Sequence, residues 1–170
     1  MLYLSEKRLA EVNELSNIGE VELAEETIIR YEEHLTAALV RAQEARSKGK
    51  DVDDVFVKVA EATYKHQDDL TDVLEKVPEE AQESVRGAMQ ESMKGYEEAL
   101  GQISSQERER VMENVQNRMQ EVEQKVNNMR ERGVEVPNVQ EVTERVRNMQ
   151  GVDVEEVQEN LMESGQKGRP

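Results

Sequence analysis

The feature that most constrains the fold is a stripe of apolar residues repeated at helical spacing over residues 52–77. Steps of three and four residues bring side chains to one side of an α-helix, whereas a half-buried strand alternates. Similar stripes occur in residues 3–17, 21–47 and 78–103, and only three prolines interrupt the 170 residues. The sequence therefore predicts an all-α fold. The clearest stripe comprises Val52, Val55, Val59, Ala62, His66, Leu70, Val73 and Val77.

The breaks between these stripes contain residues that begin or end helices. Gly19 is placed to end the first helix in the left-handed conformation. Asp51 is expected to cap the third helix, and Pro78 suits the first position of the fourth. Ser104 and Glu107 form an S-x-x-E capping box that begins a helix over 105–131. Because short connections favour antiparallel neighbours, residues 1–103 are expected to form an antiparallel four-helix bundle.

Composition changes after residue 103, which predicts two domains: a helical bundle over 1–103 and a helical C-terminal arm over 104–170. The arm contains no Ala, no aromatic residue and a single Leu. We expect its long helix to be followed by two short helices, after Asn138 and Asp153, and by a frayed tail. One face of the long helix repeats at coiled-coil spacing, and we call it the Val/Met seam. The seam comprises Met112, Val115, Met119, Val122, Val126 and Met129.

Two interpretations of the Val/Met seam remain open at this point. It either binds a protein partner or a second copy of the chain, or it covers an exposed face of the bundle itself. An apolar face needs packing to stabilise a helix, and methionine adapts to irregular surfaces, so both interpretations are physically reasonable.

Charge and cysteine content exclude several classes of partner and site. With 22 basic and 38 acidic residues the formal charge is −16, so the surface repels nucleic acid and anionic membranes. No apolar run approaches the roughly 18 residues of a membrane span, so we predict no membrane insertion of this chain. Cysteine is absent, which excludes disulfides and thiolate metal sites.

The two histidines are the main candidates for chemistry. If the second and third predicted helices form a hairpin about residues 49–50, His34 and His66 lie at the same height on neighbouring helices. With carboxylates such as Glu33, Asp69 or Glu6 they would form a site for a divalent transition metal. No other cofactor is expected.

The alternative for the histidines is structural. A buried neutral imidazole needs a hydrogen-bond partner, and Thr63, Tyr31 or a backbone carbonyl would supply one without metal. Two histidines without a third fixed ligand are weak evidence for a metal site, so the structural interpretation is favoured.

Motifs of several known sites are absent from the sequence. Di-iron bundles use Glu-x-x-His, but Tyr31 and Thr63 occupy the glutamate positions here. The run that begins at Asp51 resembles a calcium loop but has Phe56 and Ala62 where glycine and glutamate are required. No catalytic set is recognisable, so we predict that the protein is not an enzyme.

Three stretches resemble a bacterial family catalogued as domain of unknown function 5667: YEEHL at 31–35, ATYKH at 62–66 and LEKVPEEA at 74–81. The similarity covers about residues 4–100. It implies a helical module outside the cytoplasm, because members of that family are typically exported or membrane-tethered. His34 and His66 match the two histidine positions of the family pattern. Many relatives have Gly-His where this chain has Gly95-Tyr96, so a third potential ligand is missing here.

These observations favour a non-enzymatic scaffold or interaction module of the bacterial cell envelope. The alternative is a metal-binding or metal-sensing protein that uses His34 and His66. A third hypothesis is a small helical envelope chaperone, but the Leu-Thr-x-x-Gln signature of such chaperones is absent.

Overall fold

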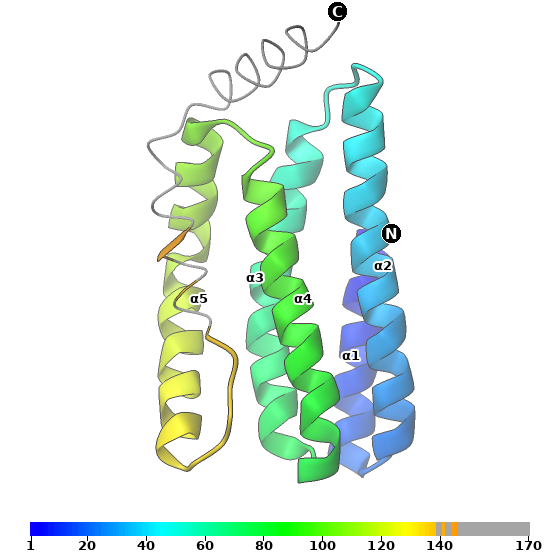
Figure 1. The fold of residues 1–170 in the computed structure, drawn as a ribbon, viewed down its shortest axis with the longest axis vertical. Helices are drawn as coiled ribbons and strands as arrows, with labels where there is room; N and C mark the ends of the chain where they lie inside the picture. The colour runs from blue at the N-terminus through cyan, green and yellow to red at the C-terminus, as the bar shows by residue number, and fades with distance from the viewer. Residues whose placement is uncertain (139–140, 142–143, 146–170) are drawn as a thin grey trace, which may run out of the picture.

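The computed structural model describes residues 1–138, 141 and 144–145, and this part of the chain is helical, without strands. The predicted all-α class is confirmed. The helices lie beside one another along the long axis of the molecule (Figure 1). In chain order the elements are α1 (Leu2–Ile18), α2 (Val21–Ser47), α3 (Asp53–Lys76), the 3-10 turn η1 (Glu79–Ala81), α4 (Gln82–Leu100) and α5 (Ser105–Glu131).

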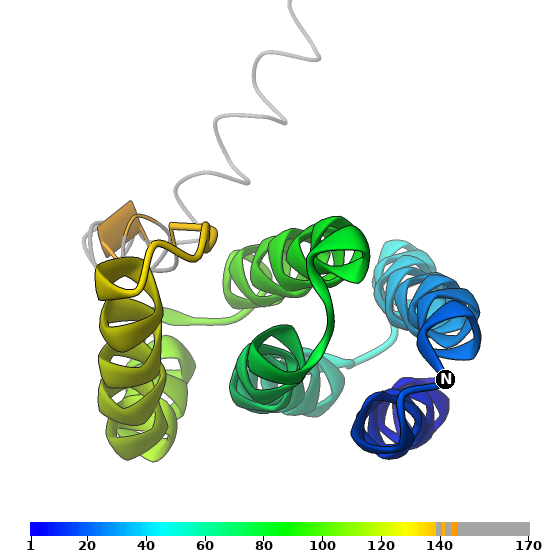
Figure 2. The ribbon, with the colours of Figure 1, turned by 90° about the horizontal axis from the view of Figure 1, so that it is seen from below.

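The helices pack mainly in two pairs, and the predicted α2–α3 hairpin is not one of them. α1 packs against α2, and α3 packs against α4, while α1–α3 and α2–α4 contacts join the two pairs. Seen end-on, α2 and α3 lie diagonally across the four-helix group, and α5 lies on the far side of α3 from α1 and α2 (Figure 2). The prediction that α2 and α3 pack side by side as an antiparallel hairpin was therefore wrong, although their connection is short.

The central position of α3 explains which of its residues are buried. Because α1, α4 and α5 all pack on it, its buried surface extends well beyond one stripe. Phe56, Tyr64 and Leu74 are fully buried, although they lie off the predicted stripe. Val55, which the stripe included, is 43% exposed. The prediction for Val55 was therefore wrong, because Phe56 takes the inward direction in the first turn of the helix.

Two predicted helix ends are confirmed, and two are corrected. Gly19 ends α1 with a φ of 80°, and Ser104 and Glu107 form the predicted capping box of α5. Val52, rather than Asp51, occupies the N-cap of α3, although the Asp51 carboxylate accepts a hydrogen bond from the backbone N–H of Asp53 at 3.3 Å. Pro78 precedes η1, so α4 begins four residues later than predicted, at Gln82.

The segment after α5 is described only in part. Asn138 Oδ1 accepts a hydrogen bond from the Glu141 N–H at 3.4 Å, as expected of the predicted cap. The second short helix, predicted after Asp153, and the predicted frayed tail lie outside the described residues.

One continuous apolar core includes residues of all five α-helices. α4 approaches α2 and α3 closely at Gly95, where a Cβ atom would lie 3.4 Å from Leu39 Cδ1 and Thr63 Cγ2. The buried apolar residues of α5 belong to this same core. The division into a 1–103 bundle and a 104–170 arm stays a prediction.

Candidate functional site

His66 lies in the centre of the bundle, where α3 faces α2. Its side chain is 1% exposed. The Tyr31 hydroxyl lies 3.1 Å from His66 Nδ1, and the two rings meet edge to face with centroids 5.3 Å apart. Tyr31 is one of the partners that the structural interpretation named. The predicted hydrogen bond between Tyr31 and His66 is present, and it satisfies one ring nitrogen of His66 within the core.

A layer of buried polar side chains surrounds this pair. Gln67 donates to the Met89 carbonyl at 2.7 Å, and Ser92 donates to the Thr63 carbonyl at 2.9 Å. Both bonds join α3 to α4, whereas the Tyr31–His66 bond joins α3 to α2. Because a buried polar group is costly unless it is paired, these bonds fix how the three helices are set relative to one another.

Burial keeps the Tyr31–His66 pair neutral. Desolvation, with a smaller contribution from Lys65, lowers the pKa of His66 to about 4. Desolvation also raises the pKa of the Tyr31 hydroxyl. His66 Nε2 is buried and has no hydrogen-bond partner among the described residues. Depending on the tautomer, this nitrogen is either an unused donor or a lone pair, and only the lone pair would suit a metal ion.

The remaining metal candidates are more exposed. His34 is half-buried, one helical turn after Tyr31, and Glu33 beside it is exposed. Asp69 is half-buried, and desolvation raises its pKa. Among the described residues, no group of three or more His, Asp or Glu side chains is arranged to bind a metal ion. The metal site at His34 and His66 stays a prediction.

The Val/Met seam is directed into the molecule. Five of its six residues are buried in the common core, and Met112 is partly buried. α5 makes its principal helix contact with α3. In this structure the seam covers α3, which is the second of the two interpretations. Binding of a partner through the seam would require α5 to separate from α3.

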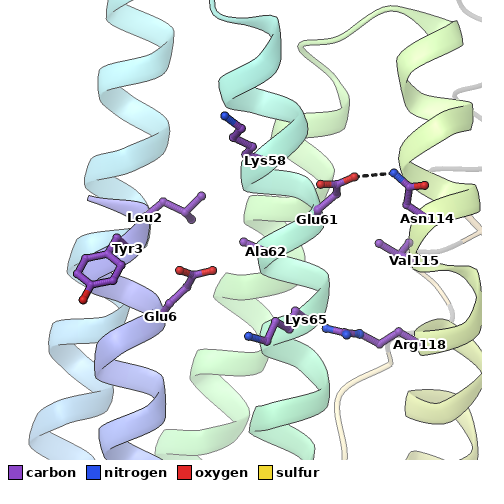
Figure 3. A pocket seen from close by; sticks show the side chains of 10 residues that line it. All are labelled: Leu2, Tyr3, Glu6, Lys58, Glu61, Ala62, Lys65, Asn114, Val115 and Arg118. Carbon is purple, nitrogen blue, oxygen red and sulfur yellow. Dashed lines mark hydrogen bonds between the residues drawn. The ribbon is translucent and has the colours of Figure 1, made fainter.

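An open groove runs along α3 between α1 and α5, with a volume of about 660 Å³ (Figure 3). We call it the α3 groove. Its apolar lining consists of Leu2 and Tyr3 from α1, Ala62 from α3 and Val115 from α5. Tyr3 is 73% exposed, so its ring projects into solvent at the edge of the groove.

The charged lining of the α3 groove is mixed in sign. Lys58, Lys65 and Arg118 are cationic, and Glu6 and Glu61 are acidic. A slight local excess of positive charge therefore occurs on a chain whose formal charge is −16. Sequence reasoning did not identify this groove. The spacing of Lys58 and Lys65 on one face of α3 was visible, but nothing in the sequence placed Arg118 opposite them.

The N-terminal part of the chain is similar to a known protein family. A family model described as Domain of unknown function (DUF5667) matches residues 1–80, from α1 through the start of η1. This match relates residues 1–80 to the DUF5667 family. The resemblance is thereby confirmed, although the model ends before α4, whereas we expected similarity to about residue 100.

The DUF5667 match places Tyr31, His66 and the α1 and α3 sides of the groove within the family segment, whereas Ser92 and the whole of α5 lie outside it. No curated protein and no solved structure is significantly similar to this chain. Within the described residues, no helix is both long and apolar enough to cross a membrane.

Proposed function

We propose that this protein is a non-enzymatic scaffold of the bacterial cell envelope that docks a protein partner. In this proposal, α1–α4 act as an antiparallel four-helix bundle and α5 extends it by one helix. The observation on which the proposal rests is the α3 groove, because concave surfaces with a mixed apolar and charged lining are typical of binding sites.

The packing around the groove supports a preformed binding surface. α3 forms its floor, and α3 is tied to α2 and α4 by the polar layer around His66. α5 forms one wall, with its seam buried in the common core. Groove walls supported in this way lose little conformational entropy on binding, which favours affinity.

The proposed location in the envelope depends on the family. Residues 1–80 match the DUF5667 family model, and the resemblance to that family implies a module outside the cytoplasm. Fractionation of the native bacterium, with an antibody against the bundle, tests the location. Recovery of the chain in the cytoplasmic fraction alone would contradict it.

Site-specific photo-crosslinking in living cells tests the docking surface. A photoreactive amino acid in place of Tyr3 should give one dominant crosslinked product of defined mass. The matched control is Ile29 on α2, which is 57% exposed and lies outside the groove lining. Equal crosslinking from both positions, or none from either, would contradict a partner in the α3 groove.

A further inference from the structure

The charge pattern of the α3 groove indicates the chemistry of its occupant. We propose that the groove accepts an acidic amphipathic helix of a partner protein, with carboxylates directed at Lys58 and Lys65. This inference rests on the proposed docking function and specifies the partner.

The floor of the groove is suited to a helical occupant. Lys58 and Lys65 are seven residues apart on α3, which at 1.5 Å per residue is about 10 Å along one helix face. Carboxylates at positions i and i+7 of a second helix repeat at the same distance. Ala62 lies between the lysines and has a small side chain, so the occupant can approach the floor closely.

The α5 wall of the groove adds a third cation, Arg118, beside Lys65. Arg118 extends from α5 toward Lys65, while Glu6 of α1 lies on the other side (Figure 3). Glu61 accepts a hydrogen bond from Asn114 at 2.7 Å, so this carboxylate is already engaged with the α5 wall. The end of the groove near Lys65 and Arg118 is therefore where an acidic ligand gains most.

The groove cations differ in their pairing from Lys125, which lies on α5. Lys125 forms ion pairs with Asp68 and Asp72, each at 2.6 Å. By contrast, Lys58, Lys65 and Arg118 form no ion pair shorter than 4.0 Å within the described part of the chain, which comprises residues 1–138, 141 and 144–145.

Asp69 also competes for two of these cations, since Lys65 and Arg118 both act to lower its pKa. Desolvation outweighs them, so the pKa of Asp69 is still raised. Because Asp69 carries at most one negative charge, it does not neutralise both Lys65 and Arg118.

The apolar part of the lining selects for an amphipathic occupant. Leu2 and Tyr3 on one wall and Val115 on the other flank the lysines. A ligand with apolar residues between its acidic positions would cover Tyr3, which is 73% exposed in the free protein. Burial of an aromatic side chain is a typical source of affinity at protein interfaces.

Selection of peptides against the full chain tests this inference. The probe is a phage-displayed library of 20-residue helical peptides with random exposed positions. We expect enriched peptides to have Asp or Glu at i and i+7 around an apolar stripe. Replacing Lys58→Glu and Lys65→Glu together should weaken their binding at least about tenfold, because oppositely charged contacts become like-charged ones.

A matched control separates a local effect from the change in net charge. Lys48→Glu with Lys50→Glu adds the same negative charge in the exposed connection between α2 and α3, outside the groove lining. This variant should retain binding within about twofold, since distant surface charges are screened by salt. Circular dichroism confirms that both variants are folded.

The outcomes distinguish this inference from the broader proposal. Enriched peptides that are not acidic, or whose binding ignores the Lys58 and Lys65 substitutions, would overturn the acidic-helix inference and leave docking intact. If no peptide binds, the acidic-helix inference fails, and crosslinking from position 3 decides whether docking fails with it. Binding to phosphatidylglycerol vesicles through the same lysines, without enrichment of acidic peptides, would replace the protein partner by a membrane surface.

Discussion

The two sides of α3 are packed by different chemistry. Toward α2 and α4, the helix presents Thr63, His66 and Gln67, all fully or almost fully buried. Toward α5, it meets the Val/Met seam, with ion pairs at the margin such as Lys125 to Asp68 and Asp72. Buried hydrogen bonds therefore join α3 to α2 and α4. Apolar contacts join α3 to α5, and ion pairs lie at the edge of that interface.

This difference predicts two kinds of mechanical behaviour. Buried hydrogen bonds have strict geometry, so the α2–α3–α4 layer has one favourable alignment. Valine and methionine contacts tolerate small shifts, because apolar attraction has little directionality and methionine is flexible. We therefore expect the α3–α5 interface to adapt more readily, while α2–α3–α4 stays fixed. The following predictions test that comparison, from the largest effect to the smallest.

Removal of α5 should have the largest effect. Truncation after Ile103 uncovers the side of α3 that the seam packs on and removes five buried seam residues. At about 1.5–3 kcal/mol for each buried apolar side chain, less the entropy regained, the loss should be at least several kcal/mol. Thermal melting and binding of an apolar dye measure it. An unchanged melting temperature would contradict the seam's role in covering α3.

Acidification should weaken the hydrogen-bonded side through His66. Burial lowers the pKa of His66 to about 4, whereas an unfolded histidine titrates near 6.5. Between these values the unfolded chain binds a proton that the folded one does not. Stability is therefore fully present above about pH 6.5 and should fall by about 3 kcal/mol as the pH drops to 4.

The control for this pH effect is the His66→Leu variant. Glu32 and Asp69 have raised pKa values through desolvation, so their protonation acts in the opposite direction as the pH falls. Both carboxyl groups remain in the variant, so the difference between the two urea-denaturation profiles isolates His66. Profiles that stay parallel from pH 7 to pH 4 would contradict a neutral buried imidazole.

Each single substitution in the Tyr31–His66 pair should lower the free energy of unfolding more than the double substitution does. Tyr31→Phe leaves His66 without its hydrogen bond, at about 1–3 kcal/mol. His66→Leu should leave the fold intact and cost less, because Ser92 remains beside the Tyr31 hydroxyl. The double variant removes both polar partners and should be closer to neutral. Urea denaturation of all four proteins gives the coupling energy.

The same variants also test the metal hypothesis. Elemental analysis of the purified protein should give equal metal content for the natural chain and for His66→Leu. Metal that copurifies with the chain and disappears on this substitution would instead support a site at His34 and His66.

The ion pairs at the α5 margin should contribute least. Lys125→Met keeps an apolar stem of similar length but removes the bonds to Asp68 and Asp72. Because these groups are partly exposed, the loss should be about 1 kcal/mol or less and should shrink at high salt. Lys94→Met, which breaks a longer and more exposed pair with Glu91, is the matched control. A larger loss for Lys94→Met would contradict this ranking.

The sequence predicted most of the secondary structure because helix signals are local. Gly19, Ser104 and Glu107 mark ends that depend only on nearby backbone groups, and they were predicted correctly. The seam was also identified, since its spacing is a property of one helix. Its contact surface was left open, because periodicity identifies an apolar face without identifying what covers it.

The site was less predictable than the helices. A buried role for His66 followed from its place in the stripe, and Tyr31 was among the expected partners. The expectation that His34 would lie opposite His66 depended on a hairpin of α2 with α3. The diagonal arrangement brings Tyr31 to the His66 ring, whereas the place of His34 relative to His66 stays a prediction. Counting residues outward from a turn works only for helices that pack side by side.

By itself, then, the sequence determined the helical class, several of the helix ends, the family resemblance of residues 1–80 and the apolar faces that require burial. Only the tertiary structure decided which faces meet: that α3 is central, that the Val/Met seam covers it, and that Lys58, Lys65 and Arg118 border one groove. The physical reason is that the two kinds of interaction act over different distances along the sequence. Helix formation depends on residues a few positions apart, whereas the choice among apolar faces depends on the packing of the whole chain.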